Sequence, residues 1–503
     1  MPIQPSAPGL ASPPAIGVDP VLCVDLDGTL VKSDTLYDST LAVARQRPAA
    51  LLSIPGWLLQ GKAALKRHLA NTIQLDVTHL PYNRELLQYL EQQRAAGRPI
   101  YLATAADAGT ANRIADHLGL FTGVLASDGQ HNLAGKNKLA AFQSRFGDNF
   151  SYIGNATADL PLLQHCQEPM VANPTPGLRA ALRNASITPV RTFNERASSA
   201  KAWLKAIRLH QWAKNLLIFV IMLLSHAWAP GIVAAVVIAF FSFGFCASAT
   251  YIVNDLLDLE VDRQHPRKRR RPFASGDLSV LSGILVVVLF LAISLVLALL
   301  VPRAVAALSP ELFYLIKPHY FLLWLGIYLV TTLAYSLRLK RTVLVDVIVL
   351  SGLYTIRIIA GSAASGIAVS AWLGSFSIFF FLSLALVKRF AELESLRARG
   401  GVSAGGRGYH ITDIEQLRSF GSASGFASVV VLTLYIFTLD AAQLYHHPRR
   451  LWLLVPVLLL WIMRLWLKAS RGQLNEDPVV YAVTDRRSLF LGFLVLAIIL
   501  SAL

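Results

Sequence analysis

The stretch Asn254-Asp255-Leu256-Leu257-Asp258-Leu259-Glu260-Val261-Asp262-Arg263 decides the organisation of the chain, because it ends an apolar run from Ile232 to Val253. In a continuing helix, residues three, four and seven apart share one face. Carboxylates grouped at the mouth of a membrane helix repel one another, and Mg²⁺ relieves that repulsion while bridging to substrate phosphates. We therefore predict a magnesium site at Asn254, Asp255, Asp258 and Asp262. The alternative is a solvated loop that serves only as a topology anchor.

A run of cations follows this stretch directly: His265-Pro266-Arg267-Lys268-Arg269-Arg270-Arg271-Pro272. Guanidinium and ammonium groups make strong hydrogen bonds to phosphate oxygens. We expect Arg267, Lys268 and Arg271 to bind substrate phosphate.

NDxxDxxxD at the end of a second membrane helix resembles the UbiA superfamily of intramembrane prenyltransferases. The longer string NDLLDLEVDRQHPRKRRRPFASG and the earlier RLHQWAKN are most similar to its decaprenyl-phosphate phosphoribosyltransferase branch. The resemblance covers roughly residues 200 to 503. It implies nine membrane helices, Asp255 and Asp258 as catalytic residues, and phosphoribosyl pyrophosphate (PRPP) and a polyprenyl phosphate as substrates.

Composition indicates a membrane protein with a soluble part. The chain has 503 residues, 54% of them hydrophobic, a mean hydropathy of +0.50 and a formal net charge of +16. That charge fits anionic lipids and phosphorylated substrates, and no basic–aromatic nucleic-acid motif accompanies it. The three cysteines have no metal or redox spacing. Residues 1–20 are rich in Pro and Ala and predict a loose cytoplasmic tail.

Residues 21–190 predict a soluble α/β domain, a doubly wound parallel sheet with a small helical cap between Leu36 and about Thr78. A strand from Val21 runs into Asp25-Leu26-Asp27-Gly28-Thr29-Leu30, which resembles motif I of the haloacid dehalogenase (HAD) superfamily. A strand from Pro99 to Ala103 precedes Thr104, Lys138 opens a helix, and a third strand leads into Asn155 and Asp159.

The resemblance to HAD enzymes implies phosphatase chemistry. Asp25 would attack phosphorus, and Asp27 would protonate the leaving oxygen and later activate water. Thr104 and Lys138 would bind the phosphoryl group. Asp159 would complete a Mg²⁺ site with Asp25 and the carbonyl of Asp27. Asn155 stands where many relatives have Asp, which predicts weaker Mg²⁺ binding; a degenerate, purely structural domain is the alternative.

Residues 191–214 predict a linker and an amphipathic helix on the membrane surface, and 215–503 an all-α membrane domain. Nine apolar runs carry the spans: Leu216–Ala229, Gly231–Val253, Leu278–Val301, Tyr320–Ser336, Val343–Gly366, Ala371–Val387, Phe426–Leu439, Leu451–Leu467 and Leu489–Leu503. Most Lys and Arg lie in alternate loops, with Arg449-Arg450 an exception. This predicts a bacterial inner-membrane protein whose HAD domain and active sites face the cytoplasm.

Further cations lie near the ends of these spans. An arginine at membrane depth, such as Arg357, must face a cavity or a partner. A structural ion pair with Asp346 is the alternative for Arg357. A glycine-rich loop, Gly400 to Gly408, predicts either a flap or a solvated linker, and the role of Asn475 to Asp485 stays open. The predicted substrate-binding set in the membrane half is Lys214, Asn215, Tyr335, Arg338, Lys340, Arg357, Lys388 and Arg389.

This excess of cations favours two anionic substrates, PRPP and a polyprenyl phosphate. We expect Mg²⁺-dependent transfer of 5-phosphoribose to the lipid, after which the HAD domain removes the 5-phosphate. The product would be polyprenyl-phosphoryl ribose, a precursor of lipid-linked arabinofuranose for the cell envelope. Three alternatives stay open: an aromatic prenyltransferase, a soluble-substrate phosphatase with a membrane anchor, and a non-catalytic scaffold. A homo-oligomer is also compatible with the sequence.

Overall fold

The computed structural model describes residues 20–398, 400, 408–474 and 477–503, which form two compact units. The N-terminal unit comprises the described residues up to Ala206 together with Asp255–Leu285. The membrane unit comprises Ile207–Asn254 and Val286–Leu503. The acidic segment, Asp255–Arg263, therefore packs with the N-terminal domain, although the sequence predicted that it belongs to the membrane domain.

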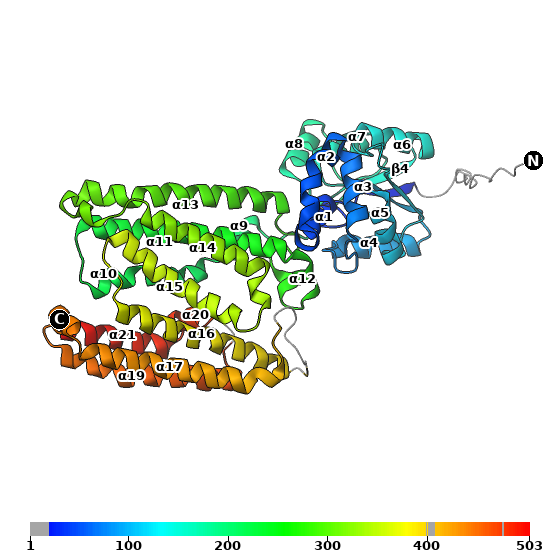
Figure 1. Cartoon of the computed structure of the whole chain (residues 1–503). Helices are drawn as coiled ribbons and strands as arrows, with labels where there is room; N and C mark the ends of the chain where they lie inside the picture. Colours follow the sequence, from blue (N-terminus) through cyan, green and yellow to red (C-terminus); the bar gives the residue numbers. More distant parts are fainter. Residues whose placement is uncertain (1–19, 399, 401–407, 475–476) are drawn as a thin grey trace, which may run out of the picture. The chain divides into compact units, whose positions relative to one another are not determined.

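A six-stranded parallel sheet forms the centre of the N-terminal unit (Figure 1). Its spatial order is β3-β2-β1-β4-β5-β6, so chain order reverses beside β1, where the carboxyl ends of strands form a crevice. This confirms the predicted α/β class. The strands are β1 (Val21–Val24), β2 (Ile100–Asp107), β3 (Gly123–Ser127), β4 (Phe150–Gly154), β5 (Pro169–Ala172) and β6 (Arg191–Phe193).

Both faces of this sheet are covered, which explains the continuous apolar strands. Along β1, Leu22 and Val24 pack into one cluster with residues of α4 (Arg84–Ala95) and α5 (Ala108–Leu118). Val21 and Cys23 point to the opposite face and a second cluster. The helices over that face are α6 (Lys136–Phe146), α7 (Leu160–His165) and α8 (Pro176–Asn184).

The predicted cap is present and is helical. It has its own small core, built around Val43, Leu69 and Ile73. Its elements are α1 (Thr35–Gln46), a 3₁₀ helix η1 (Pro48–Ser53), α2 (Ile54–Leu59) and α3 (Lys62–Thr72). In the same unit, α12 (Leu259–Gln264) and η4 (Lys268–Arg270) carry the acidic segment and the cation run.

The chain is an integral membrane protein: eight segments of its described part are long and apolar enough to cross a membrane, where the sequence predicted nine. The ninth predicted run corresponds to α21 (Arg486–Ala502), which has 17 residues. The eight are Ser199–Leu224, Pro230–Leu257, Val280–Leu308, Tyr320–Leu337, Val345–Ser365, Ala371–Arg397, Ile411–Ile436 and Pro448–Ser470.

The first of these segments differs from the predicted surface helix. It consists of α9 (Ser199–Ile207), the 3₁₀ helix η3 (Leu209–Phe219) and α10 (Val220–Leu224). Arg208 has a φ of 56°, which interrupts the helix between α9 and η3. The amphipathic helix predicted within residues 191–214 is therefore divided into α9 and η3, and Lys214 lies on η3.

Close contacts at glycines join several helices of the membrane unit. In α15 (Val345–Ser365), a Cβ on Gly361 would lie 2.1 Å from the carbonyl oxygen of Ile218, so η3 touches the α15 backbone. In α17 (Ile414–Ile436), a Cβ on Gly421 would lie 2.2 Å from the ring of Trp466 on α19 (Leu454–Ser470). Small residues at these contacts let helices approach closely without a hydrophobic driving force.

Candidate active sites

The first candidate site lies at the carboxyl end of β1 in the N-terminal unit. The Nζ atom of Lys138 donates to Asp25 Oδ1 over 2.7 Å and to the hydroxyl of Tyr152 over 3.1 Å. That hydroxyl donates to Asp159 Oδ1 over 2.8 Å. The structure thus brings together the predicted nucleophile, lysine and second aspartate, although they are distant in sequence. Tyr152, on β4, is a member of this network that sequence reasoning missed.

Asp27 has surroundings that suit a general acid. Its Oδ1 accepts the backbone N–H of Thr35, the first residue of α1, over 2.7 Å. Burial raises the pKa of Asp27 to about 8, and the nearby Asp34 acts in the same direction. Burial also raises the pKa of Asp25, to about 6, against the lowering effect of Lys138. A carboxyl group that keeps its proton near neutral pH can donate it to a leaving oxygen.

The donor set around β1 and β4 fits Mg²⁺. The amide of Asn155 lies against the loop after β1, because a Cβ on Gly28 would be 1.9 Å from its Nδ2. Asp159 Oδ2 instead accepts the backbone N–H groups of Asn155 and Ala156. Asp25, the carbonyl of Asp27 and the Asn155 oxygen could hold the ion as hard oxygen donors. In this arrangement Asp159 shapes the loop that presents Asn155.

Two residues of this site differ from expectation. Thr104 is buried inside β2, which continues to Asp107, and its Oγ1 accepts the N–H of Ala106. The predicted strand end at Ala103 was therefore wrong, because a register irregularity lets β2 continue along β3. Lys66 of the cap was missed. Its Nζ donates to the Ala105 carbonyl over 2.7 Å, and the charges of Asp25 and Asp27 act on it.

The second candidate site is the acidic segment. The Nη1 atom of Arg271 lies 3.0 Å from Asp255 Oδ1 and 2.6 Å from Asp262 Oδ2. Asp258 lies between α11 (Pro230–Leu257) and α12 and pairs instead with Arg45 of α1, at 3.3 Å. The continuous helix with all carboxylates on one face was wrong, since the helix ends at Leu257 and restarts at Leu259.

Divalent-metal chemistry still fits this segment. In the described chain no group of three or more His, Cys, Asp or Glu side chains is close enough to hold a metal. Asp255 and Asp262 nevertheless converge on one cationic group, and Asp262 Oδ1 is buried without a hydrogen-bond partner. Mg²⁺ commonly takes one or two protein carboxylates and completes its shell with substrate phosphate and water. Of the other predicted cations here, Lys268 lies 4.0 Å from Asp262 and Arg267 is exposed.

The third candidate site centres on Asp477 in the membrane unit. Its Oδ2 accepts hydrogen bonds from Lys214 Nζ over 2.8 Å and from Lys388 Nζ over 3.0 Å. The hydroxyl of Tyr354 donates to Oδ1 over 2.9 Å. Burial acts to raise the pKa of Asp477, but the two ammonium groups outweigh it and hold that pKa well below the usual range. From sequence the role of the stretch Asn475 to Asp485 stayed open, because the partners of Asp477 are 263 and 89 residues away.

Arg357, on α15, belongs to the same region. It is 4% exposed, and its Nε donates to Asn215 Oδ1 over 2.9 Å. Its other hydrogen bonds go to the Leu353 carbonyl and the Tyr328 hydroxyl, and within the described residues no carboxylate pairs with it. The Nδ2 amide of Asn215 is buried without a partner in the same part of the chain. A buried cation and a buried donor therefore lie side by side, and the hydrogen-bond partners of this cation are neutral groups.

Arg389, in contrast, has the structural ion pair that was considered for Arg357. Its Nε pairs with Asp346 and its Nη2 donates to the hydroxyl of Tyr335 over 2.7 Å. Tyr409 donates to Asp346 as well, and Arg389 is 1% exposed. The structure thus places Arg389 and Tyr335 in one hydrogen-bonded network around the buried Asp346. Of the remaining predicted cations, Arg338 is exposed and Lys340 partly exposed. Of the glycine-rich loop Gly400 to Gly408, predicted as a flap or a linker, residues 401–407 lie outside the described residues.

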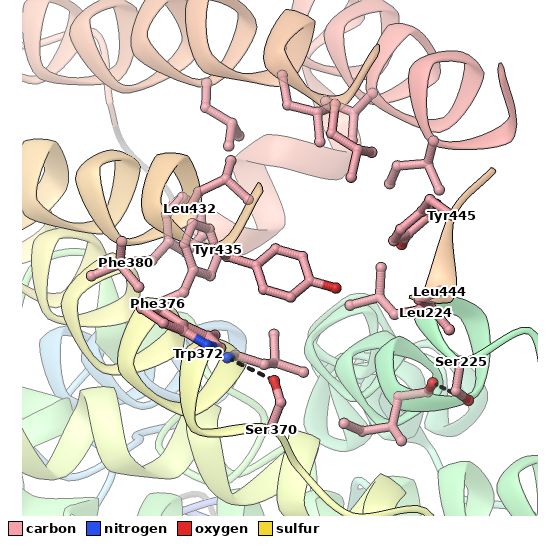
Figure 2. A pocket seen from close by; sticks show the side chains of 18 of the residues that line it. Leu224, Ser225, Ser370, Trp372, Phe376, Phe380, Leu432, Tyr435, Leu444 and Tyr445 are labelled. Atoms are coloured by element: carbon pink, nitrogen blue, oxygen red, sulfur yellow. Dashed lines mark hydrogen bonds between the residues drawn. The ribbon is translucent and has the colours of Figure 1, made fainter. Parts of the chain in front are cut away.

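An apolar cavity of about 600 Å³ lies in the membrane unit (Figure 2). Aliphatic side chains form most of its wall, aromatic side chains including Trp372 and Phe376 contribute to it, and Tyr435 projects into it. Its labelled lining residues are Leu224, Ser225, Ser370, Trp372, Phe376, Phe380, Leu432, Tyr435, Leu444 and Tyr445.

A chain of rings connects this cavity to the Asp477 site. Phe380, in the cavity wall, lies 5.5 Å from Phe381 between ring centroids, and Phe381 stacks on Tyr354 at 5.2 Å. The hydroxyl of Tyr354 reaches Asp477. An amphiphile with an anionic head and an apolar tail would match these two neighbouring environments.

Comparison with known proteins extends this description. Residues 216–494 match the model of the UbiA prenyltransferase family. The uncharacterized protein y4nM of Sinorhizobium fredii is 39% identical over 95% of this chain and 89% of its own length. A decaprenyl-phosphate phosphoribosyltransferase of Corynebacterium glutamicum is 34% identical over 39% of this chain and 55% of its own. A UbiA homolog from Archaeoglobus fulgidus, solved with GPP and Mg²⁺, is 16% identical, with a TM-score of 0.45 over 60% of this chain and 99% of its own.

Proposed function

Because the chain belongs to the UbiA prenyltransferase family, we propose that its membrane unit transfers 5-phosphoribose from PRPP to a polyprenyl phosphate. The observation that carries this proposal is the buried cationic group of the membrane unit. In the described part of the chain, Lys214 and Lys388 share one carboxylate, Asp477, and Arg357 hydrogen-bonds to the neutral Asn215. Buried charges need compensation, so an anionic substrate is the natural complement. The 34% identity to a decaprenyl-phosphate phosphoribosyltransferase supports the same choice.

The transfer reaction needs no general base. A lipid phosphate oxygen would attack C1 of the ribose, form the new C–O bond and displace pyrophosphate with its electron pair. The nucleophile is already an anion, so catalysis rests on positioning and electrostatics. Asp255, Asp258 and Asp262 would hold Mg²⁺ and Asn254 would assist, while Arg271 would bind departing phosphate oxygens. When bound, Mg²⁺ supplies positive charge to the leaving pyrophosphate.

The cavity gives the lipid tail a place. We assign the isoprenoid chain of the acceptor to the apolar cavity around Tyr435 and Phe380. Its phosphate would then lie at Lys214 and Lys388, at the other end of the ring chain through Phe381. This assignment does not require the isoprenoid chain of the acceptor to have decaprenyl length.

The N-terminal unit would act on the product of the transfer. Asp25 would attack the phosphorus of the 5-phosphate and form an aspartyl phosphate, while Asp27 gives its proton to the departing 5-oxygen. Asp27 would next take a proton from water, whose oxygen attacks phosphorus and releases inorganic phosphate and free Asp25. Lys138 would neutralise the transferring phosphoryl group. The final product is polyprenyl-phosphoryl ribose, a precursor for lipid-linked arabinofuranose in the cell envelope.

The distribution of Lys and Arg supports an orientation in which both sites face the cytoplasm, where PRPP is made. In that orientation the phosphoribosyl lipid and the N-terminal domain share one compartment.

One experiment tests the two reactions separately. Purified full-length protein in detergent receives PRPP, Mg²⁺ and a polyprenyl phosphate, and lipid products are resolved by mass spectrometry. Wild type should give the ribosyl lipid, Asp25→Asn the phosphoribosyl lipid, and Asp258→Asn neither. If wild type stops at the phosphoribosyl lipid, the phosphatase assignment is wrong. If PRPP is not consumed, the donor assignment is wrong.

A further inference from the structure

A single helix of the N-terminal unit, α1, contacts both candidate catalytic regions of that unit. At its start, the backbone N–H of Thr35 donates to Asp27. At its end, Arg45 Nη1 lies 3.3 Å from the Leu257 carbonyl and 3.3 Å from Asp258 Oδ1. A helix of 12 residues spans about 18 Å. The phosphatase acid and the acidic segment are therefore joined by one rigid element.

Arg45 acts at the point where α11 ends and α12 begins. Leu257 is the last residue of α11, so its carbonyl has no partner within the helix. Arg45 donates to this carbonyl and also pairs with Asp258, the residue between the two helices. One guanidinium thus fixes both the helix end and the side chain of a predicted metal ligand.

A buried ion pair anchors the same contact one to two turns earlier on α1. Arg263 Nη1 lies 2.8 Å from Asp38 Oδ2, with 3% and 1% of the two side chains exposed. The Ser33 hydroxyl donates to the same oxygen over 2.6 Å, and Arg263 Nε donates to the Ala274 carbonyl. The charges therefore have several fixed partners, which buried ions require. Because Arg263 follows Asp262 directly, this anchor also restrains the second carboxylate of the acidic segment.

Two more hydrogen bonds surround the anchor. Gln46, the last residue of α1, donates to Glu260 over 3.0 Å, and Gln264 donates to Asp76 over 3.0 Å. Side chains of the N-terminal domain thus contact the chain at several points from Leu257 to Gln264.

We propose that α1 is a positioning element of the transferase, with Arg45 and Asp38 orienting Asp258 and Asp262 for the donor pyrophosphate. The inference rests on the proposed transferase function. It assigns the N-terminal domain a second role, in which it shapes the donor site independently of its own phosphatase reaction. Arg45 and Asp38 touch no reacting atom and act through the carboxylates.

Arg45→Gln tests this proposal in the full-length protein, because Arg45 is partly exposed and its loss leaves no buried charge unpaired. Arg45→Lys is the conservative variant, and Arg47→Gln is the matched control at an exposed arginine two residues away. The first readout is hydrogen–deuterium exchange of the amides of residues 259–264, which requires neither metal nor substrate. A charge-assisted contact that lowers the equilibrium constant for local opening about tenfold should, when it is lost in Arg45→Gln, speed this exchange about tenfold. Arg45→Lys should be intermediate, and Arg47→Gln should match wild type.

The second readout is the Mg²⁺ concentration that gives half-maximal transferase activity. Positioning predicts that this concentration rises in Arg45→Gln, while hydrolysis of p-nitrophenyl phosphate stays unchanged. If Arg45 is only a counter-ion that competes with Mg²⁺, the concentration falls, and the proposal is overturned. Unchanged exchange at residues 259–264 overturns it as well. If the wild-type protein consumes no PRPP, the proposed transferase function is refuted. The hydrogen–deuterium exchange measurement still decides whether Arg45 holds residues 259–264 in place.

Discussion

Replacing Arg357 by Gln should weaken substrate binding and leave the protein as stable as wild type or more so. Arg357 is buried, and its hydrogen bonds go to the neutral groups of Asn215, Leu353 and Tyr328. Gln retains polar contact with these groups but removes the charge. If a substrate phosphate completes this site, the lost charged hydrogen bond is worth about 1.5–3 kcal/mol, or roughly a 10- to 150-fold rise in KM for the lipid phosphate.

Replacing Arg389 by Gln should instead lower the stability of the protein. Arg389 is paired with Asp346, so Arg389→Gln leaves a buried carboxylate with one partner fewer. Breaking such a pair costs about 3–5 kcal/mol. Removing the charge of Arg357 leaves no orphaned carboxylate in the described chain, and the unfolding temperature should stay constant or rise.

The assay combines steady-state kinetics with varied polyprenyl phosphate and thermal unfolding in the same detergent. Arg389→Gln is the matched control, since it removes the same group from an equally buried position. Two results together would refute the reasoning: a lower unfolding temperature for Arg357→Gln, and an unchanged KM. Arg357 would then be a structural residue.

Three further outcomes are expected. Gly28→Ala should abolish phosphatase activity with transfer retained, because Gly28 has a φ of +77° and its Cβ would collide with Asn155; product analysis checks this. Lys214→Gln should raise KM for the lipid phosphate more than Lys388→Gln, since their side chains are 10% and 29% exposed; equal effects in parallel titrations would contradict this. Chelation with EDTA should stop both reactions. Wild type should need a higher Mg²⁺ concentration to recover phosphatase activity than the Asn155→Asp variant needs.

Much of the N-terminal site could be predicted from local sequence. Apolar strands followed by Asp25 and Asp159 place polar side chains at one sheet edge once the sheet is parallel, whereas Thr104 lies inside β2. Tyr152 could not be identified as a site residue from the sequence, because nothing in the pattern distinguishes it from other residues of a buried strand. Lys66 was hidden too, since its place beside Asp25 and Asp27 depends on how the cap folds back.

The acidic segment shows where periodicity is insufficient. Spacing alone predicted a continuous helix, but the chain breaks at Asp258, where Arg45, 212 residues away from Leu257, takes the helix-end carbonyl. The same limit applies to Asp477, whose partners Lys214 and Lys388 come from distant helices. Sequence could find the cations, and it could not say which carboxylate each one meets.

Arg357 and Arg389 are both buried, but they differ in whether a carboxylate pairs with them, and this difference indicates the charge of the substrate. Arg389 meets both Asp346 and Glu392, so its network is closed. Among the described residues, Lys214 and Lys388 both pair with Asp477, and Arg357 hydrogen-bonds to the neutral Asn215, so the three positive charges have one negative partner and the described set carries +2. A phosphate monoester carries about −1.5 to −2 at pH 7. The charge balance therefore favours a lipid monophosphate over a lipid diphosphate, and it is the reason to prefer a polyprenyl phosphate acceptor to an aromatic one.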